Sequence, residues 1–191
     1  MKNLNTQERI LSAAESLIQK RGYNAFSYKD IAAEVGIKTS SIHYYYPAKE
    51  DLAVAVIDWQ INRIASVLDD IKGQAHLSTK DKLLMLIESI VSLTYADEMK
   101  MCLGGMFASE LLSLPESVQI KARHFFKTLT QWIEEVLTEG KQLGSMKLLY
   151  PMDKFPLYLV LQIEGALLMS RLYGDRGPIN SVKQFIEDVV D

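Results

Sequence analysis

Apolar residues recur at intervals of three and four through most of this 191-residue chain, whereas the alternating pattern of strands is nearly absent. Between residues 49 and 71, for example, the spacing is kept by Ile57, Ile61, Ile64 and Leu68. Such spacing places an apolar stripe along one face of an α-helix. The sequence therefore predicts an all-α fold of about nine helices.

Capping residues and helix breakers set the expected helix boundaries. Ser27 and Ser78 are good N-caps, Gly140 is expected to end one long helix, and Asp153 is expected to cap another. The predicted helices cover residues 6–21, 27–36, 38–46, 49–71, 78–97, 101–112, 116–140 and 155–173, with a last helix after Asn180 or Ser181.

Composition favours a soluble protein of a reducing compartment. Cys102 is the only cysteine, so no disulfide can form within the chain, and the first six residues lack the apolar run of a secretion signal. The apolar stretch 155–173 contains Glu164 and Arg171, which a membrane span tolerates poorly. We expect a buried helix there, no membrane contact and a cytoplasmic location.

Charge is distributed unevenly along the chain. Residues 1–50 hold seven Lys or Arg against five Asp or Glu, while the remainder holds 14 against 19. A mildly basic head on an acidic body suits a protein that touches phosphates with one small surface. The difference is small, so the decision between functions depends on motifs.

Two short predicted helices separated by Gly36 have the pattern of a helix-turn-helix, whose turn needs a residue that adopts a left-handed conformation at little cost. Ile31, Val35 and Ile42 are expected to pack the two helices together. The second helix projects small hydroxyl, aromatic and basic side chains that can reach base edges and phosphates. The same residues could be the core and rim of an ordinary helical hairpin. Spacing alone therefore leaves open a helical ligand-binding or interaction module without DNA function.

The stretch from Thr6 to Leu52 resembles the DNA-binding head of the tetracycline-repressor-like (TetR/AcrR) family. The matching segments are Ala13-Ala14, Gly22-Tyr23, Phe26-Ser27, Asp30-Ile31-Ala32, Val35-Gly36-Ile37, Ser41 to Pro47 and Lys49 to Leu52. The resemblance implies a DNA-binding domain over residues 1–50 and a dimerisation and ligand-sensing domain over residues 51–191. It further implies a homodimeric repressor that a small-molecule inducer releases from a palindromic operator in double-stranded DNA.

Carried over position by position, the resemblance also implies which side chains contact DNA. Ser27 and Tyr28 would meet the backbone, and Lys49 would bind phosphate. The side chains that would face bases or hold phosphates are Lys38, Thr39, Ser40, Ser41, His43, Tyr44 and Tyr45. The family often has Lys-Gly at Thr39-Ser40 and tyrosine at His43, so the individual operator contacts do not transfer in detail.

The body of the chain offers candidates for an inducer cavity and for a subunit interface. Thioether and aromatic side chains line adaptable apolar pockets, although each of these residues can equally be plain core. The cavity candidates are Trp59, Met85, Tyr95, Met99, Met101, Cys102, Met106, Phe107, Phe125 and Trp132. The interface candidates, on the 116–140 and 155–173 helices, are Phe126, Ile133, Gly165, Ala166 and Ser170.

Cys102 has two interpretations. It follows Lys100 at the expected start of a helix, where a thiolate is stabilised, and its segment resembles a family subgroup that responds to electrophiles. The inducer is therefore expected to be a small apolar or electrophilic molecule. The alternative is a cysteine that only packs the core.

Enzyme signatures are not found. The sequence has no HExxH, phosphate loop or GxSxG, and His43, His76 and His124 stand far apart. We expect no catalytic residues, no metal and no cofactor.

Overall fold

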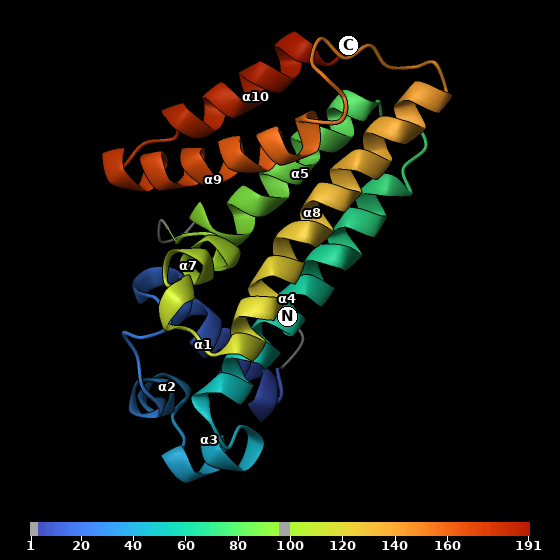
Figure 1. The fold of residues 1–191 in the computed structure, drawn as a ribbon. Helices are drawn as coiled ribbons and strands as arrows, with labels where there is room; N and C mark the ends of the chain where they lie inside the picture. The colour runs from blue at the N-terminus through green and yellow to red at the C-terminus, as the bar shows by residue number, and fades with distance from the viewer. Residues whose placement is uncertain (1–3, 96–99) are drawn as a thin grey trace. The chain divides into compact units, whose positions relative to one another are not determined.

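The computed structural model describes residues 4–95 and 100–191. Within these ranges the chain forms nine α-helices and one 3₁₀ turn, drawn in chain order in Figure 1. They are α1 (Thr6–Arg21), α2 (Tyr28–Val35), α3 (Thr39–Tyr45), α4 (Lys49–Lys72), α5 (Thr79–Leu93), α7 (Leu103–Ser109), η1 (Leu111–Ser113), α8 (Glu116–Gln142), α9 (Phe155–Tyr173) and α10 (Gly177–Val189). Outside the helices, Leu148 and Val190 form an isolated bridge. The all-α prediction is confirmed.

The helices pack into two compact units. The first joins Met1–Asn62 to Leu103–Phe125, and its core includes the fully buried Ile10, Ile42 and Phe107. The second joins Arg63–Cys102 to Phe126–Asp191, where α10 packs on both α9 and α5. This division by packing differs from the functional division expected at residue 50, because residues 103–125 pack with the N-terminal helices.

Local capping chemistry explains several helix starts. Ser27 and Ser78 are N-caps as predicted, each paired with an aspartate three residues on. The backbone N–H and the hydroxyl of Ser27 both donate to Asp30, at 2.7 Å, and these bonds hold the pKa of Asp30 below its usual value. The first helix is capped by Asn5, which forms a capping box with Glu8.

Several predicted boundaries were wrong. Gly140 lies inside α8, which continues to Gln142. The N-cap of α9 is Lys154, one residue after Asp153. The last helix begins at Gly177, with Pro178 in its first turn. Proline is tolerated there because the N–H groups of a first turn have no acceptor within the helix.

A further wrong boundary concerns the segment predicted to be helical over 101–112. It is divided between a seven-residue helix, α7, and the separate turn η1. The helix predicted over 78–97 ends at Leu93 in α5, and residues 96–97 lie outside the described residues.

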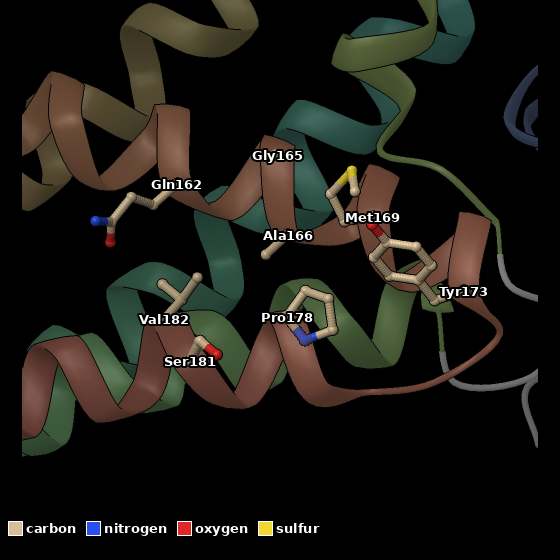
Figure 2. A pocket seen from close by; sticks show the side chains of 8 residues that line it. All are labelled: Gln162, Gly165, Ala166, Met169, Tyr173, Pro178, Ser181 and Val182. Carbon is tan, nitrogen blue, oxygen red and sulfur yellow. The ribbon is translucent and has the colours of Figure 1, made fainter.

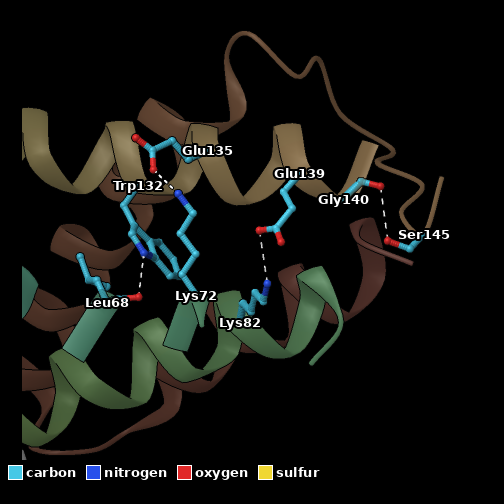
Figure 3. Close-up of polar contacts among 8 residues, drawn as sticks. All are labelled: Leu68, Lys72, Lys82, Trp132, Glu135, Glu139, Gly140 and Ser145. Carbon is cyan, nitrogen blue, oxygen red and sulfur yellow. Dashed lines mark hydrogen bonds and ion pairs between the residues drawn. The ribbon is translucent and has the colours of Figure 1, made fainter. Parts of the chain in front are cut away.

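Polar contacts fix the second unit along α8. The Trp132 indole N–H donates to the Leu68 carbonyl at 3.0 Å, and the ammonium of Lys72 lies 2.5 Å from Glu135 (Figure 3). The ammonium of the buried Lys82 lies 3.3 Å from the Glu139 carboxylate, which compensates a charge that would otherwise be costly to bury. These contacts link α8 to the end of α4 and to α5.

Candidate DNA-binding site

The turn between α2 and α3 has the geometry expected of a helix-turn-helix. Gly36 adopts a left-handed conformation with φ of +73°, and its N–H donates to the Ala32 carbonyl at 2.9 Å. Val35 and Ile42 are buried on the facing sides of the two helices. The guanidinium of Arg9 on α1 donates to the Val35 carbonyl, which ties the turn to the first helix.

The opposite side of α2 and α3 is open to solvent. Of the predicted DNA-contacting residues, those exposed are Ser27, Lys38, Ser40, His43, Tyr44 and Tyr45. Tyr28, Thr39, Ser41 and Lys49 are half-buried. Tyr44 is the most prominent, with 82% of its surface exposed, and its ring meets that of Tyr45 edge-on. All ten predicted residues therefore come from one short stretch of the first unit.

Two of these residues also hold α3 in place. The Tyr28 hydroxyl donates to the Tyr46 carbonyl at 2.8 Å, and its ring lies 4.7 Å from that of His43. Burial is the main cause that raises the pKa of Tyr28 to about 12, so its hydroxyl stays protonated and able to donate. Nδ1 of His43 lies 3.2 Å from the Pro47 carbonyl. Tyr28 and His43 thus fix the C-terminal end of α3.

Lys49 points into the head of the protein. Its ammonium donates to the Phe26 carbonyl at 2.5 Å and lies over the rings of Phe26 and Tyr23, 4.1 and 4.7 Å from their centroids. Burial lowers the pKa of Lys49, and the carboxylates of Glu110 and Asp30 oppose that shift. To bind phosphate as the sequence predicted, Lys49 would have to leave the Phe26 carbonyl and the two rings.

Sequence reasoning missed Glu110, whose carboxylate accepts hydrogen bonds from the turn between α1 and α2. These partners are 86 and 87 residues away along the chain. No local pattern marks a contact of that separation, since helical periodicity and caps describe only neighbours within about four residues.

The predicted inducer-cavity residues are distributed over both compact units. Trp59, Met106, Phe107 and Phe125 belong to the first unit, and Met85, Tyr95, Met101, Cys102 and Trp132 to the second. The buried ones among the described residues are Tyr95, Met101, Cys102, Phe107, Phe125 and Trp132. Met99 lies outside the described residues.

A pocket of about 390 Å³ lies between α9 and α10 within the second unit (Figure 2). It is lined by Gln162, Gly165, Ala166, Met169, Tyr173, Pro178, Ser181 and Val182. Two of these, Gly165 and Ala166, were predicted as interface residues, and none of them was predicted to line an inducer cavity.

The predicted interface residues divide between core and surface. Ile133 and Ser170 have no exposed surface and Ala166 is buried, because each lies on the inward side of its helix. For these three the structure disagrees with the expected surface position. Phe126 is half-buried, and Gly165 is exposed.

An apolar face of α9 is exposed instead. Its large exposed residues are Leu157, Tyr158, Leu161, Leu168, Leu172 and Tyr173, and all of them except Tyr158 are more than half exposed. In length and composition α9 could also cross a membrane, while its other face packs in the second unit. Of the helix expected over 155–173, one face is buried and the other is exposed.

A three-helix head with an exposed helix-turn-helix, followed by a helical body, defines a class of DNA-binding regulators. Residues 10–56 match the family described as bacterial regulatory proteins, tetR family. The crystal structure of a TetR transcriptional regulator from Legionella pneumophila is 46% identical, with 98% of each chain covered and a TM-score of 0.91. The chain belongs to the TetR family and is a helix-turn-helix transcriptional regulator.

Two further proteins extend the similarity over nearly the whole chain. A TetR-family transcriptional regulator from Agrobacterium tumefaciens is 27% identical, with 97% of each chain covered and a TM-score of 0.89. An uncharacterized HTH-type transcriptional regulator in the lacX 3' region of Lactococcus lactis subsp. lactis is 26% identical over 93% of this chain and 89% of its own. Regulators of this family bind DNA operators and form dimers.

Proposed function

We propose that the protein is a cytoplasmic repressor that binds a palindromic operator as a homodimer and leaves it when a small molecule binds the helical body. The observation that carries this proposal is the exposed α2–α3 face, on which the Gly36 turn, small hydroxyl residues and a protruding Tyr44 stand together. Small side chains at the start of α3 allow close approach to a major groove, and two-fold symmetry of a dimer implies two half-sites about one helical turn apart.

The proposed base-reading residues are Lys38, Thr39, Ser40 and Ser41, and the proposed phosphate-holding residues are Tyr44 and Tyr45. Selection from a random duplex library followed by titration of the selected site tests this assignment. Tyr44→Phe should weaken binding to all sequences alike, because it removes one hydroxyl that can bond phosphate. Ser40→Ala should instead change the preferred bases. If the wild-type chain selects no sequence, the proposed function is wrong.

We propose that the dimer forms through the exposed face of α9 and the groove that α9 makes with α10. Leu161, Leu168 and Leu172 stand on this face at helical spacing, and a contiguous apolar surface of this kind is rare on a protein that stays monomeric. Gly165 lies among them with no atom near the position of a Cβ, so another helix can approach closely there. A second copy of α9 would offer the same surface, as a two-fold interface requires.

The proposed inducer is a small apolar molecule with a hydrogen-bond donor. Gln60 on α4 is 2% exposed, and its side-chain oxygen accepts no hydrogen bond within the described part of the chain. A buried acceptor of this kind is costly unless a ligand or water satisfies it. Gln60→Leu should therefore reduce the response to the inducer while it preserves operator binding, measured by release of the selected duplex across a library of small molecules.

An electrophilic inducer acting on Cys102 is a second proposal. The thiol is buried, and it donates a hydrogen bond to Glu164, a carboxyl whose pKa is raised chiefly by burial. Burial favours the packing role. The test compares operator release by a quinone in wild type and Cys102→Ser, and equal release from both would assign Cys102 to packing.

A further inference from the structure

The turn between α1 and α2 is held by a side chain from a distant part of the first unit. The backbone N–H of Tyr23 donates to Oε2 of Glu110 at 2.5 Å, and that of Asn24 donates to Oε1 at 3.3 Å. The Asn24 amide adds a third bond to Oε1 at 3.1 Å. We call these three bonds the Glu110 contact. Both carboxylate oxygens are thus engaged with the turn.

The surroundings are shaped for this carboxylate. Gly22 has φ of +92°, and a Cβ added there would lie 2.8 Å from Oε2 of Glu110. The Asn24 amide also donates to the Ser113 hydroxyl at 2.8 Å, and that hydroxyl donates to the Glu110 carbonyl at 2.8 Å. The end of α7 and the turn η1 are therefore bonded to the α1–α2 turn through side chains and backbone together.

The α1–α2 turn leads directly into the helix-turn-helix. Ser27, the N-cap of α2, follows Phe26, whose carbonyl accepts the bond from Lys49. The Tyr23 ring contacts Phe26 at 6.4 Å and Phe107 of α7 at 6.2 Å between ring centroids. A shift of this turn would move the start of α2 relative to α1 and α7, and with it the DNA-facing side chains.

We propose that Glu110 is a positioning residue for DNA binding, which fixes the helix-turn-helix through the α1–α2 turn without touching DNA. The proposal rests on the operator-binding function proposed above. The change in charge distinguishes this role from a direct electrostatic effect on DNA affinity. Removing a carboxylate makes the protein more positive, which by itself strengthens binding to a polyanion. A fall in affinity on removal of Glu110 therefore cannot come from the change in charge.

The test uses the full-length chain and the duplex selected by the wild type. Glu110→Ala should weaken operator binding about tenfold, as expected for the loss of hydrogen bonds to a charged group. Glu110→Gln should weaken it less than Glu110→Ala. The amide oxygen of glutamine can still accept a hydrogen bond from the turn, whereas its NH₂ group is a donor and cannot accept the second one. Glu116→Ala and Glu116→Gln are matched controls, since Glu116 is exposed at the start of α8. Neither should weaken binding.

Amide exchange of the segment 22–27 gives a readout that general destabilisation does not reproduce. Exchange there should accelerate in the Glu110 variants, while exchange in α5 and α9 and the dimer mass stay as in the wild type. Unchanged or increased affinity of Glu110→Ala would overturn the proposal, and if that variant fails to fold, unchanged affinity of Glu110→Gln would do so. A wild-type chain that binds no duplex would overturn the operator-binding function itself, and this inference with it.

Discussion

Two lysines of the DNA-binding head have opposite surroundings, and the sequence alone does not distinguish them. Lys38 is exposed before α3, whereas Lys49 is engaged by the Phe26 carbonyl and by two aromatic rings. We predict that Lys49→Met lowers the free energy of unfolding by about 1–2 kcal/mol, since it removes a charged hydrogen bond and cation–π contacts. Lys38→Met should leave stability unchanged and reduce the salt dependence of DNA binding.

Denaturant unfolding and operator titration at several salt concentrations measure both effects. The opposite pattern, in which Lys49→Met changes only the salt slope, would restore the phosphate contact expected from the sequence. The family resemblance located this lysine correctly at the start of α4. It could not show the direction of the side chain, because that direction depends on the rings of Tyr23 and Phe26, which belong to a distant part of the sequence.

Glu164 carries a pH dependence of stability. Burial raises its pKa, partly opposed by the hydrogen bond from Cys102. A raised folded-state pKa means that the stabilising contribution is complete below the unfolded pKa and is lost as pH rises through the folded value. We therefore predict that Glu164→Gln, which stays neutral, is more stable than wild type at pH 7 and similar at pH 4. Parallel stability curves for the two proteins from pH 4 to pH 7 would contradict this.

At the scale of helices, the sequence predicted elements well wherever the signal is local. The caps Ser27 and Ser78, the left-handed Gly36 and the start of α4 at Lys49 all depend on residues within one turn. Gly140 shows where such rules fail. It looks like a helix terminator, yet α8 runs through it because its missing side chain allows a close approach to Thr79. Tertiary packing decides this position, and no local pattern encodes it.

That contact gives a prediction for the packing of α8 on α5. A Cβ added at Gly140 would lie 2.1 Å from Oγ1 and 3.3 Å from Cβ of Thr79, which is itself buried. Gly140→Ala should therefore destabilise the fold by about 1–3 kcal/mol, although alanine favours helices. Thr79→Ala in the same chain should recover part of the loss, so that a double-mutant cycle shows coupling. Strictly additive unfolding energies would refute the close contact.

At the scale of the whole molecule, the sequence predicted the fold and the helix-turn-helix but not which face of α9 is exposed. The segment 155–173 is apolar nearly all round, so its pattern does not tell a core face from an exposed one. Ala166 and Ser170 were predicted as interface residues and are buried, whereas Leu161 and Leu168 are exposed. The choice depends on where α10 and α5 pack, which is a property of the assembled chain.

The exposed face of α9 leads to a prediction about assembly and, through it, about DNA binding. Leu161 and Leu168 are 61% and 55% exposed. In a two-fold dimer the interface would bury each of them in both subunits. A charge introduced at such a position would be desolvated in both subunits, and truncating a well-packed interface residue alone typically costs on the order of 2 kcal/mol. Leu161→Glu or Leu168→Glu should therefore give monomers in sedimentation velocity at micromolar concentration, and operator affinity should fall at least about tenfold.

Leu143→Glu supplies the matched control for that experiment. Leu143 is 72% exposed and lies in the connection after α8, outside α9. Leu143→Glu makes the same change in charge and in apolar surface at a position outside the proposed interface. It should therefore leave both the dimer and operator binding as in the wild type. If all three variants sediment as dimers, α9 is not the interface. If Leu161→Glu is a monomer that still binds the full palindrome with wild-type affinity, the two heads act independently, and the two-fold docking on adjacent half-sites is wrong.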